Sequence, residues 1–297
     1  MKHRKILITG ACGRVGRCVL AELAPVSDVT VLDLAEPEPG VAFVQGDVTD
    51  LATVRRAVAG RDAVIHLAAI DLGVPAEPER YFGVNVMGTW NVLQAACEAG
   101  VGKAVLASSI SATGVGELRP DFPPEYLPVD EAHPLKPIHP YGVSKLVVAD
   151  VAQSFARRGD IAVVCLRPVN VLVPSQLHRY VARASDPDHR WLAAYVTGAD
   201  TARAFRLALD YDREPYDAFF ISAADSSAWE PTLERAERLF GRLPEVRDPA
   251  RYEREPRASM IDATRARERL GWEPKVTFRE LVEMMVDADV SRLKAGS

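Results

Sequence analysis

Short apolar runs alternate with longer helical patterns along this chain. Almost continuous apolar runs occupy 5–10, 28–33, 62–69, 103–109, 161–168 and, later, 217–223. Such runs are typical of parallel strands covered on both faces. Helical spacing of apolar residues predicts helices at 14–24, 51–58, 80–99, 141–157, 199–210, 230–240, 262–269 and 278–293. The alternation predicts an α/β fold with a doubly wound, Rossmann-type parallel sheet.

Composition narrows the class of protein without naming a function. The chain has 297 residues, a formal net charge of −5 and 48% hydrophobic residues, which is ordinary globular usage. The acidic balance argues against nucleic-acid binding, and no apolar stretch reaches the roughly 18 residues of a membrane span. The four cysteines are widely spaced. We therefore expect a reduced, cytoplasmic protein with no metal site and no membrane partner.

A glycine-rich turn follows the first predicted strand. Gly10, Gly13 and Gly16 have GxxGxxG spacing and enclose Arg14 and Val15, where the first helix begins. Small residues let backbone N–H groups approach a pyrophosphate, which a helix N-terminus attracts. The turn therefore predicts a dinucleotide site.

An acidic residue at the end of the second strand indicates which dinucleotide is bound. Asp33 lies 23 residues after Gly10, close to the roughly 20 expected. A carboxylate there accepts hydrogen bonds from a ribose diol and repels a 2′-phosphate, which favours NAD over NADP. Arg14 and Arg17 are a counterargument, because an arginine near the turn can hold that phosphate.

Two further segments fit the same site. Asp47 and Val48 follow an apolar run, where the carboxylate can lie beside the adenine. Leu67, Ala68 and Ala69 end another strand, and their small side chains let a flat ring come close.

A tyrosine and a lysine carry the candidate chemistry. Tyr141 and Lys145 lie four positions apart in a predicted helix, which puts phenol and ammonium on one face. A free phenol has a pKa near 10, and a neighbouring cation stabilises its phenolate as a base. Ser109 ends a strand on the edge where ligands bind. An amphipathic helix surface and a capping serine are the structural alternatives.

These motifs together resemble the extended short-chain dehydrogenase/reductase family, in its NAD-dependent epimerase/dehydratase group. The segments TGACGRVG, GDV, HLAA, NVMGTWNVLQAA, SS, YGVSK, LRPVN and LGWEP occur in the expected order. The resemblance implies catalytic Ser109, Tyr141 and Lys145, with Asn85 completing a proton relay, and a cofactor contact at Pro168. It also implies a homodimer through the helices at 80–99 and 141–157.

The resemblance also implies two parts of the chain. Residues 1–170 would form the NAD-binding domain, and 171–297 a small substrate-binding region of which about 193–224 returns to the sheet. Only 30 residues separate Asn170 from Asp200, where a sugar-nucleotide epimerase is longer. This short layout is more similar to uronate dehydrogenases, which oxidise a free sugar acid.

Candidate substrate contacts follow from the positions where this sequence departs from the family pattern. The tyrosine that usually follows the serine strand is absent, so Ser111 or Thr113 can take a polar substrate contact. Asn170 matches the family pattern, and Arg183 or Arg190 can pair a substrate carboxylate in a bidentate fork. A solvated surface charge explains either arginine equally well.

Three functions remain open at this point. The first is an NAD-dependent oxidoreductase that takes hydride from a hydroxyl of a sugar or sugar acid. The second is a sugar-nucleotide epimerase or dehydratase with tightly bound NAD. The third is a non-catalytic NAD-binding regulator, which the complete Ser109, Tyr141 and Lys145 set argues against.

Overall fold

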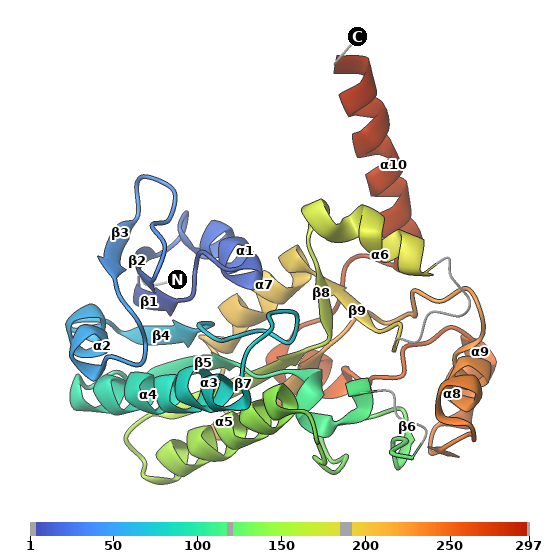
Figure 1. The fold of residues 1–297 in the computed structure, drawn as a ribbon, viewed down its shortest axis with the longest axis horizontal. Helices are drawn as coiled ribbons and strands as arrows, with labels where there is room; N and C mark the ends of the chain where they lie inside the picture. The colour runs from blue at the N-terminus through green and yellow to red at the C-terminus, as the bar shows by residue number, and fades with distance from the viewer. Residues whose placement is uncertain (1–3, 118–120, 185–191, 296–297) are drawn as a thin grey trace.

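Seven strands form one central sheet in the computed structural model, which describes residues 4–117, 121–184 and 192–295 (Figure 1). All neighbouring strands of this sheet are parallel, which confirms the predicted fold class. The strands are β1 (Lys5–Thr9), β2 (Asp28–Asp33), β3 (Ala42–Gln45), β4 (Ala63–His66), β5 (Lys103–Ala107), β7 (Ala162–Pro168) and β10 (Tyr216–Ile221).

The order of the strands places a topological switch point at the middle of the sheet. The spatial order is β10, β7, β5, β4, β1, β2, β3. The chain therefore runs outward from β1 to β3 and returns to β4, which lies beside β1. It then forms the other half of the sheet with β5, β7 and β10. Ligands of such sheets bind outside the carboxyl ends of the strands at this switch point, which here lies between β1 and β4.

Helices cover both faces of the sheet and bury two apolar cores. On one face, α1 (Arg14–Leu23) packs against α7 (Gly198–Ala208). On the other face lie α2 (Leu51–Val58), α4 (Gly88–Glu98) and α5 (Pro140–Arg157), and Figure 1 shows α4 and α5 side by side. Both faces of every central strand are thus covered, which is why these strands are almost continuously apolar.

The helix predicted at 80–99 is not one regular helix. It consists of α3 (Pro78–Tyr81), a π-helical segment η1 (Phe82–Met87) and α4. π-helical turns interrupt α-helices mostly at functional sites, and Asn85 lies inside this one.

The remaining elements are short or lie in the C-terminal third. The small strands are β6 (Tyr126–Leu127), β8 (Asn170–Leu172), β9 (Tyr195–Thr197) and β11 (Glu245–Val246). The helices are α6 (Leu177–Ala184), α8 (Thr232–Phe240), α9 (Pro249–Arg254) and α10 (Phe278–Ala295), with shorter helical segments η2 (Ile110–Thr113), η3 (Val115–Glu117), η4 (Pro174–Gln176) and η5 (Ala266–Leu270). In Figure 1, α10 carries the C-terminus away from the sheet.

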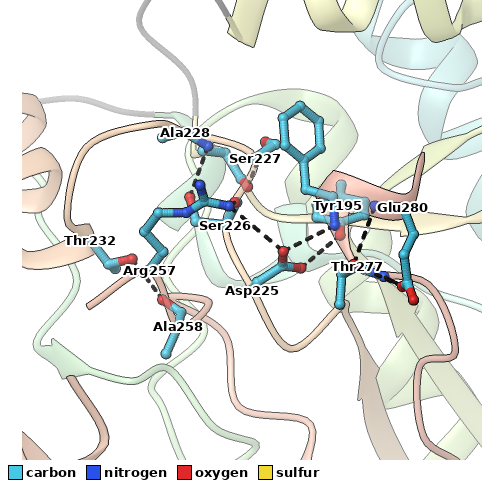
Figure 2. Close-up of polar contacts among 12 residues, drawn as sticks. Tyr195, Asp225, Ser226, Ser227, Ala228, Thr232, Arg257, Ala258, Thr277 and Glu280 are labelled. Atoms are coloured by element: carbon cyan, nitrogen blue, oxygen red, sulfur yellow. Dashed lines mark hydrogen bonds and ion pairs between the residues drawn. The ribbon is translucent and has the colours of Figure 1, made fainter. Parts of the chain in front are cut away.

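A polar cluster around Asp225 joins the C-terminal elements to each other (Figure 2). One carboxylate oxygen accepts a hydrogen bond of 2.6 Å from the Tyr195 hydroxyl on β9. The other accepts the backbone N–H of Phe278 at 3.0 Å, at the start of α10. Thr277 and Glu280 close that helix end with reciprocal hydrogen bonds. The Asp225 carboxylate therefore fixes where α10 begins relative to β9.

Among the helices of the described residues, none combines the length and the apolar content that crossing a bilayer requires.

Candidate active site

The glycine-rich turn lies at the switch point of the sheet, after β1 and before α1. Gly10 has φ +74°, and a Cβ atom there would lie 2.4 Å from the Ala68 nitrogen. A Cβ atom on Gly16 would lie 2.1 Å from the Gly10 carbonyl oxygen. Gly13 is the N-cap residue of α1, so the first N–H groups of this helix are not covered by a capping side chain. The turn thus has the form that fits a dinucleotide pyrophosphate.

Asp33 lies across this turn, at the end of β2. Its Oδ2 accepts the Cys12 backbone N–H at 2.9 Å, and its Oδ1 accepts the Ala35 N–H at 3.1 Å. These bonds hold the carboxylate at the carboxyl edge of the sheet, where a ribose diol would meet it. The residues present therefore fit NAD, with Asp33 on the adenosine side.

The loops after β3 and β4 lie at the same edge of the sheet as the glycine-rich turn. Asp47 accepts the Thr49 N–H at 2.9 Å, and Val48 is buried against the backbone of Gly88. Leu67 donates its N–H to Thr9 O at 3.0 Å, and Ala68 lies against Gly10. The segment 67–69 is thus held directly beside the glycine turn.

His66, at the end of β4, is a buried histidine whose two ring nitrogens both have hydrogen-bond partners. Its ring nitrogens lie 2.6 Å from Thr9 Oγ1 and 3.0 Å from Thr89 Oγ1. Burial, with a smaller effect of Lys145, lowers its pKa to about 3. The ring is therefore neutral at physiological pH and serves to join β4 to α4.

Arg14 reaches from the glycine turn across the carboxyl edge of the sheet. Its Nη1 donates to the carbonyl of Val171 at 3.3 Å and to Gln176 Oε1 at 3.1 Å. Its Nη2 forms an ion pair of 3.0 Å with Asp71. Arg14 thus connects the turn to the loop after β4, to β8 and to η4.

Tyr141, Lys145 and Ser109 converge at the end of β5. The first turns of α5 carry Tyr141 and Lys145, and the Lys145 Nζ lies 5.8 Å from the centre of the Tyr141 ring. Lys145 donates to the Ala107 carbonyl at 2.8 Å, which anchors it to the end of β5. Ser109 accepts the Ser111 N–H at 3.1 Å as the N-cap of η2, and it lowers the pKa of the Tyr141 phenol.

The ionisation of these groups is set by burial and by one carboxylate. Burial raises the pKa of Tyr141, and Asp71 raises it further, whereas Ser109 and Arg14 lower it. Burial lowers the pKa of Lys145 to about 8, against an opposing effect of Asp71. Lys145 is therefore still a cation at pH 7. The Tyr141 phenol is protonated at that pH unless a further positive charge beside it lowers its pKa.

Asn85 braces the loop after β4 against α5. Its side-chain Oδ1 accepts the Ile70 N–H at 2.8 Å, and its Nδ2 donates to the Ile70 carbonyl at 3.2 Å. The same Nδ2 donates to Ser144 Oγ at 2.9 Å. The contacts of Asn85 thus run to Ser144, the neighbour of Lys145, so its place in a proton relay stays a prediction.

The predicted substrate contacts lie in different surroundings. Ser111 and Tyr141 line a cavity of about 450 Å³ together with Leu72, Glu117 and His139. Thr113 is buried and donates its hydroxyl to the Ile110 carbonyl at 2.7 Å.

The other predicted contacts lie in or next to the C-terminal region. Asn170 begins β8 and lowers the pKa of the Tyr180 phenol, and Pro168 ends β7. Arg183 lies on α6, but its side chain is outside the described residues, as is all of Arg190.

Asp71 is the site residue that sequence reasoning missed. It lies in the loop that follows HLAA, and it contacts Arg14 while acting on Tyr141 and Lys145. A signal was available, because an acidic residue directly after a strand-end segment lies at the ligand-binding edge of the sheet. Its neighbours, however, come from parts of the chain far apart in sequence.

A dinucleotide turn at the switch point and a Ser–Tyr–Lys set beside it define a short-chain dehydrogenase/reductase of the extended type. The family profile described as "NAD dependent epimerase/dehydratase family" matches residues 6–199. The chain belongs to this family, which confirms the predicted family and the predicted NAD-dependent enzyme.

The relatives include both an epimerase and a dehydrogenase, which correspond to the first two functions that the sequence left open. A UDP-glucose 4-epimerase from Streptococcus mutans is 29% identical over 328 residues, covering 95% of this chain and 95% of the relative. An L-arabinose 1-dehydrogenase (NAD(P)(+)) from Haloferax volcanii is 29% identical over 228 residues, covering 74% of this chain and 89% of the relative. A short-chain dehydrogenase/reductase superfamily protein from Agrobacterium tumefaciens, solved with bound NAD, has a TM-score of 0.75 and 27% identity over 98% of this chain and 99% of that one.

Proposed function

We propose that the protein is an NAD-dependent dehydrogenase that oxidises a hydroxyl-bearing carbon of a small sugar or sugar acid. The convergence of Ser109, Tyr141 and Lys145 beside a cavity of about 450 Å³ carries this proposal. Pockets of about 300–1,000 Å³ suit small molecules. The L-arabinose dehydrogenase among the relatives supports it, as does the short interval between Asn170 and Asp200.

Each residue of the set has a distinct role in this proposal. Tyr141 takes the proton of the substrate hydroxyl, Ser109 holds the substrate oxygen, and Lys145 stabilises the phenolate and holds the cofactor ribose. NAD, when bound, supplies the hydride acceptor. The substrate thus loses one proton to Tyr141 and one hydride to the cofactor, and a carbonyl compound is released.

A second candidate is a sugar-nucleotide epimerase that uses NAD without net turnover. The observation in its favour is the similarity to a UDP-glucose 4-epimerase over 95% of both chains. The two functions differ in their products, since only the dehydrogenase accumulates NADH.

The experiment is a spectrophotometric assay of NADH formation with free aldoses, sugar acids and UDP-sugars. We expect NADH with a free sugar or sugar acid, and a loss of roughly 10²- to 10⁴-fold in kcat for Tyr141→Phe. Tyr252→Phe removes a buried hydroxyl elsewhere, bonded to the Ser259 carbonyl at 3.4 Å, and should leave kcat unchanged. Stereochemical change of a UDP-sugar without NADH would establish the epimerase instead.

We also propose a homodimer through the helical face that contains η1, α4 and α5. Three large apolar side chains are exposed there: Phe82 (39%), Met87 (53%) and Trp90 (42%). A reducing, cytoplasmic location is supported by the four cysteines, which are all unpaired. We further propose that 1–170 forms the NAD-binding domain and that 171–297 supplies the substrate side, with β10 contributed back to the sheet.

A further inference from the structure

His139 lies where two cavities meet, two positions before Tyr141 in the chain. The cavity of about 450 Å³ that Tyr141 lines is also lined by His139 and Leu72. A second cavity, of about 560 Å³, is lined by the same two residues together with Tyr81. His139 is exposed, so a molecule that enters the first cavity can contact its ring.

The contacts of His139 hold both its ring and its backbone in place. As the N-cap residue of α5, His139 accepts the Tyr141 backbone N–H on Nδ1 at 3.1 Å. Its ring packs edge-on against the buried Tyr81 ring, with 6.1 Å between the ring centres. Glu117 Oε1 accepts the backbone N–H groups of Ile138 and His139 at 2.8 and 2.9 Å. The imidazole therefore has a defined orientation at the cavity wall.

The N-cap hydrogen bond also decides where the ring of His139 carries its hydrogen. A neutral imidazole has one N–H donor, and its other nitrogen is an acceptor. Because Nδ1 accepts from the Tyr141 backbone, the neutral ring carries its hydrogen on Nε2. Among the described residues, none is a hydrogen-bond partner of this Nε2. His139 thus offers an oriented and unused N–H donor at the cavity.

Glu117 supplies an acceptor close to this donor. Its two backbone hydrogen bonds both use Oε1, so Oε2 can accept a further donor, and Glu117 lines the same cavity as His139. A hydroxyl group can accept from the imidazole and donate to the carboxylate at the same time. A carboxylate group of a ligand can only accept, and it would face the like charge of Glu117. The pair therefore fits a hydroxyl group.

We propose that His139 is a substrate-binding residue that donates a hydrogen bond from Nε2 to a hydroxyl group of the sugar, at a carbon other than the one oxidised. The reacting hydroxyl belongs to Tyr141 and Ser109 in the proposed function, so His139 binds a different oxygen along the same cavity. Glu117 accepts the hydrogen of the hydroxyl that His139 binds. This inference rests on the proposed dehydrogenase function and deepens it, because it names a substrate group that the site recognises.

Two substitutions separate substrate binding from helix capping. His139→Asn keeps the cap, because asparagine is a preferred N-cap residue, but its side chain is too short to place a donor where Nε2 lies. We expect KM for D-glucose and D-galactose to rise roughly 3- to 10-fold with little change in kcat. His139→Gln places its amide nitrogen near the position of Nε2 and loses the cap. It should recover most of the lost affinity while its melting temperature falls.

Deoxy sugars give a second readout that a capping role would not change. The parent protein should lose roughly 3- to 10-fold in kcat/KM on the one monodeoxy derivative of D-galactose that lacks the recognised hydroxyl. His139→Asn should lose nothing further on that derivative, because the two changes remove the same contact.

Asp248→Ala is the matched control for loss of a helix cap. Asp248 is the N-cap residue of α9 and accepts the Arg251 N–H at 3.0 Å. Its removal should lower the melting temperature and leave KM for the sugar unchanged.

Two results would overturn the proposal for His139. One is the same KM in the parent and in His139→Asn, and the other is an equal loss on every deoxy derivative in both proteins. If no NADH forms with any free sugar, the dehydrogenase proposal fails separately. His139 is then judged by calorimetric titration of D-galactose into the NADH-saturated protein. The parent must bind the sugar more tightly than His139→Asn does, and equal affinities or no binding would overturn the assignment of His139 as well.

Discussion

At the scale of single residues, the chemistry depends on a few polar atoms held at the carboxyl edge of the sheet. Tyr141 and Lys145 share a helical face because they lie four positions apart, and the sequence predicts this. The environment of Tyr141 could not be predicted from the sequence. Its phenol is buried and lies beside Asp71, 70 residues earlier in the chain, so the pKa of Tyr141 is a property of the folded molecule.

The cofactor preference can be tested at Asp33. Asp33→Asn keeps an oxygen for the backbone N–H of Cys12 but removes the charge that repels a 2′-phosphate. We expect the ratio of kcat/KM for NAD to that for NADP to fall by roughly 10-fold or more. Steady-state kinetics with both cofactors measure this ratio. Asp28→Asn, at the exposed start of the same strand, is the control, and an unchanged ratio in Asp33→Asn would contradict the assignment.

At the scale of elements, the predicted strands and helices were confirmed where an apolar pattern repeats over several turns or fills a buried strand. The helix at 51–58 and the strand at 28–33 have the bounds expected. The strand β3 was not predicted, because its four residues are only half buried at the sheet edge. The π-helical turn η1 was also not foreseen, since its widened hydrogen bonding is stabilised by the contacts of Asn85 with the loop after β4 and with α5.

Glu131 gives a pH-dependent prediction for the edge strand β10. Its Oε1 accepts the Phe220 backbone N–H at 2.7 Å, and burial raises its pKa to about 7. Because this folded-state pKa lies above the unfolded value, the contribution of Glu131 to stability is present at acid pH and is lost as pH rises from about 4.5 to about 7. Glu131→Gln should therefore be more stable than the parent by about 1–2 kcal/mol at pH 8, with no gain at pH 5.

Thermal unfolding at the two pH values measures this difference. Glu125→Gln, an exposed acid in the same connection, should show no such divergence between pH 5 and pH 8. A Glu131→Gln protein that is less stable than the parent at pH 8 would show that attraction to Arg265 and Arg167 outweighs the burial of the carboxylate.

At the scale of the whole molecule, the proposed dimer face can be tested by placing a charge in it. Met87→Glu changes a side chain that is 53% exposed on η1, so the fold of one subunit should persist. Burying that charge in an apolar interface is costly, and we expect a monomer by sedimentation velocity. Leu243→Glu, on a distant exposed apolar residue, should leave the association state unchanged. A Met87→Glu protein that sediments as the parent does would exclude this face.

The sequence alone determined the parts of this protein that depend on neighbours along the chain. Apolar runs fixed the parallel strands, glycine spacing fixed the turn at β1, and the tyrosine–lysine spacing fixed one face of α5. These features follow from backbone sterics and from burial, which are local.

The tertiary structure decided which side chains meet at the candidate site. Arg14, Asp71 and Tyr141 meet only because β1, β4 and α5 converge at the switch point of the sheet. Charge effects act over a few ångströms in space regardless of separation in sequence. The sequence therefore indicated the dinucleotide and the Ser–Tyr–Lys set, while only the fold placed a carboxylate near the Tyr141 phenol.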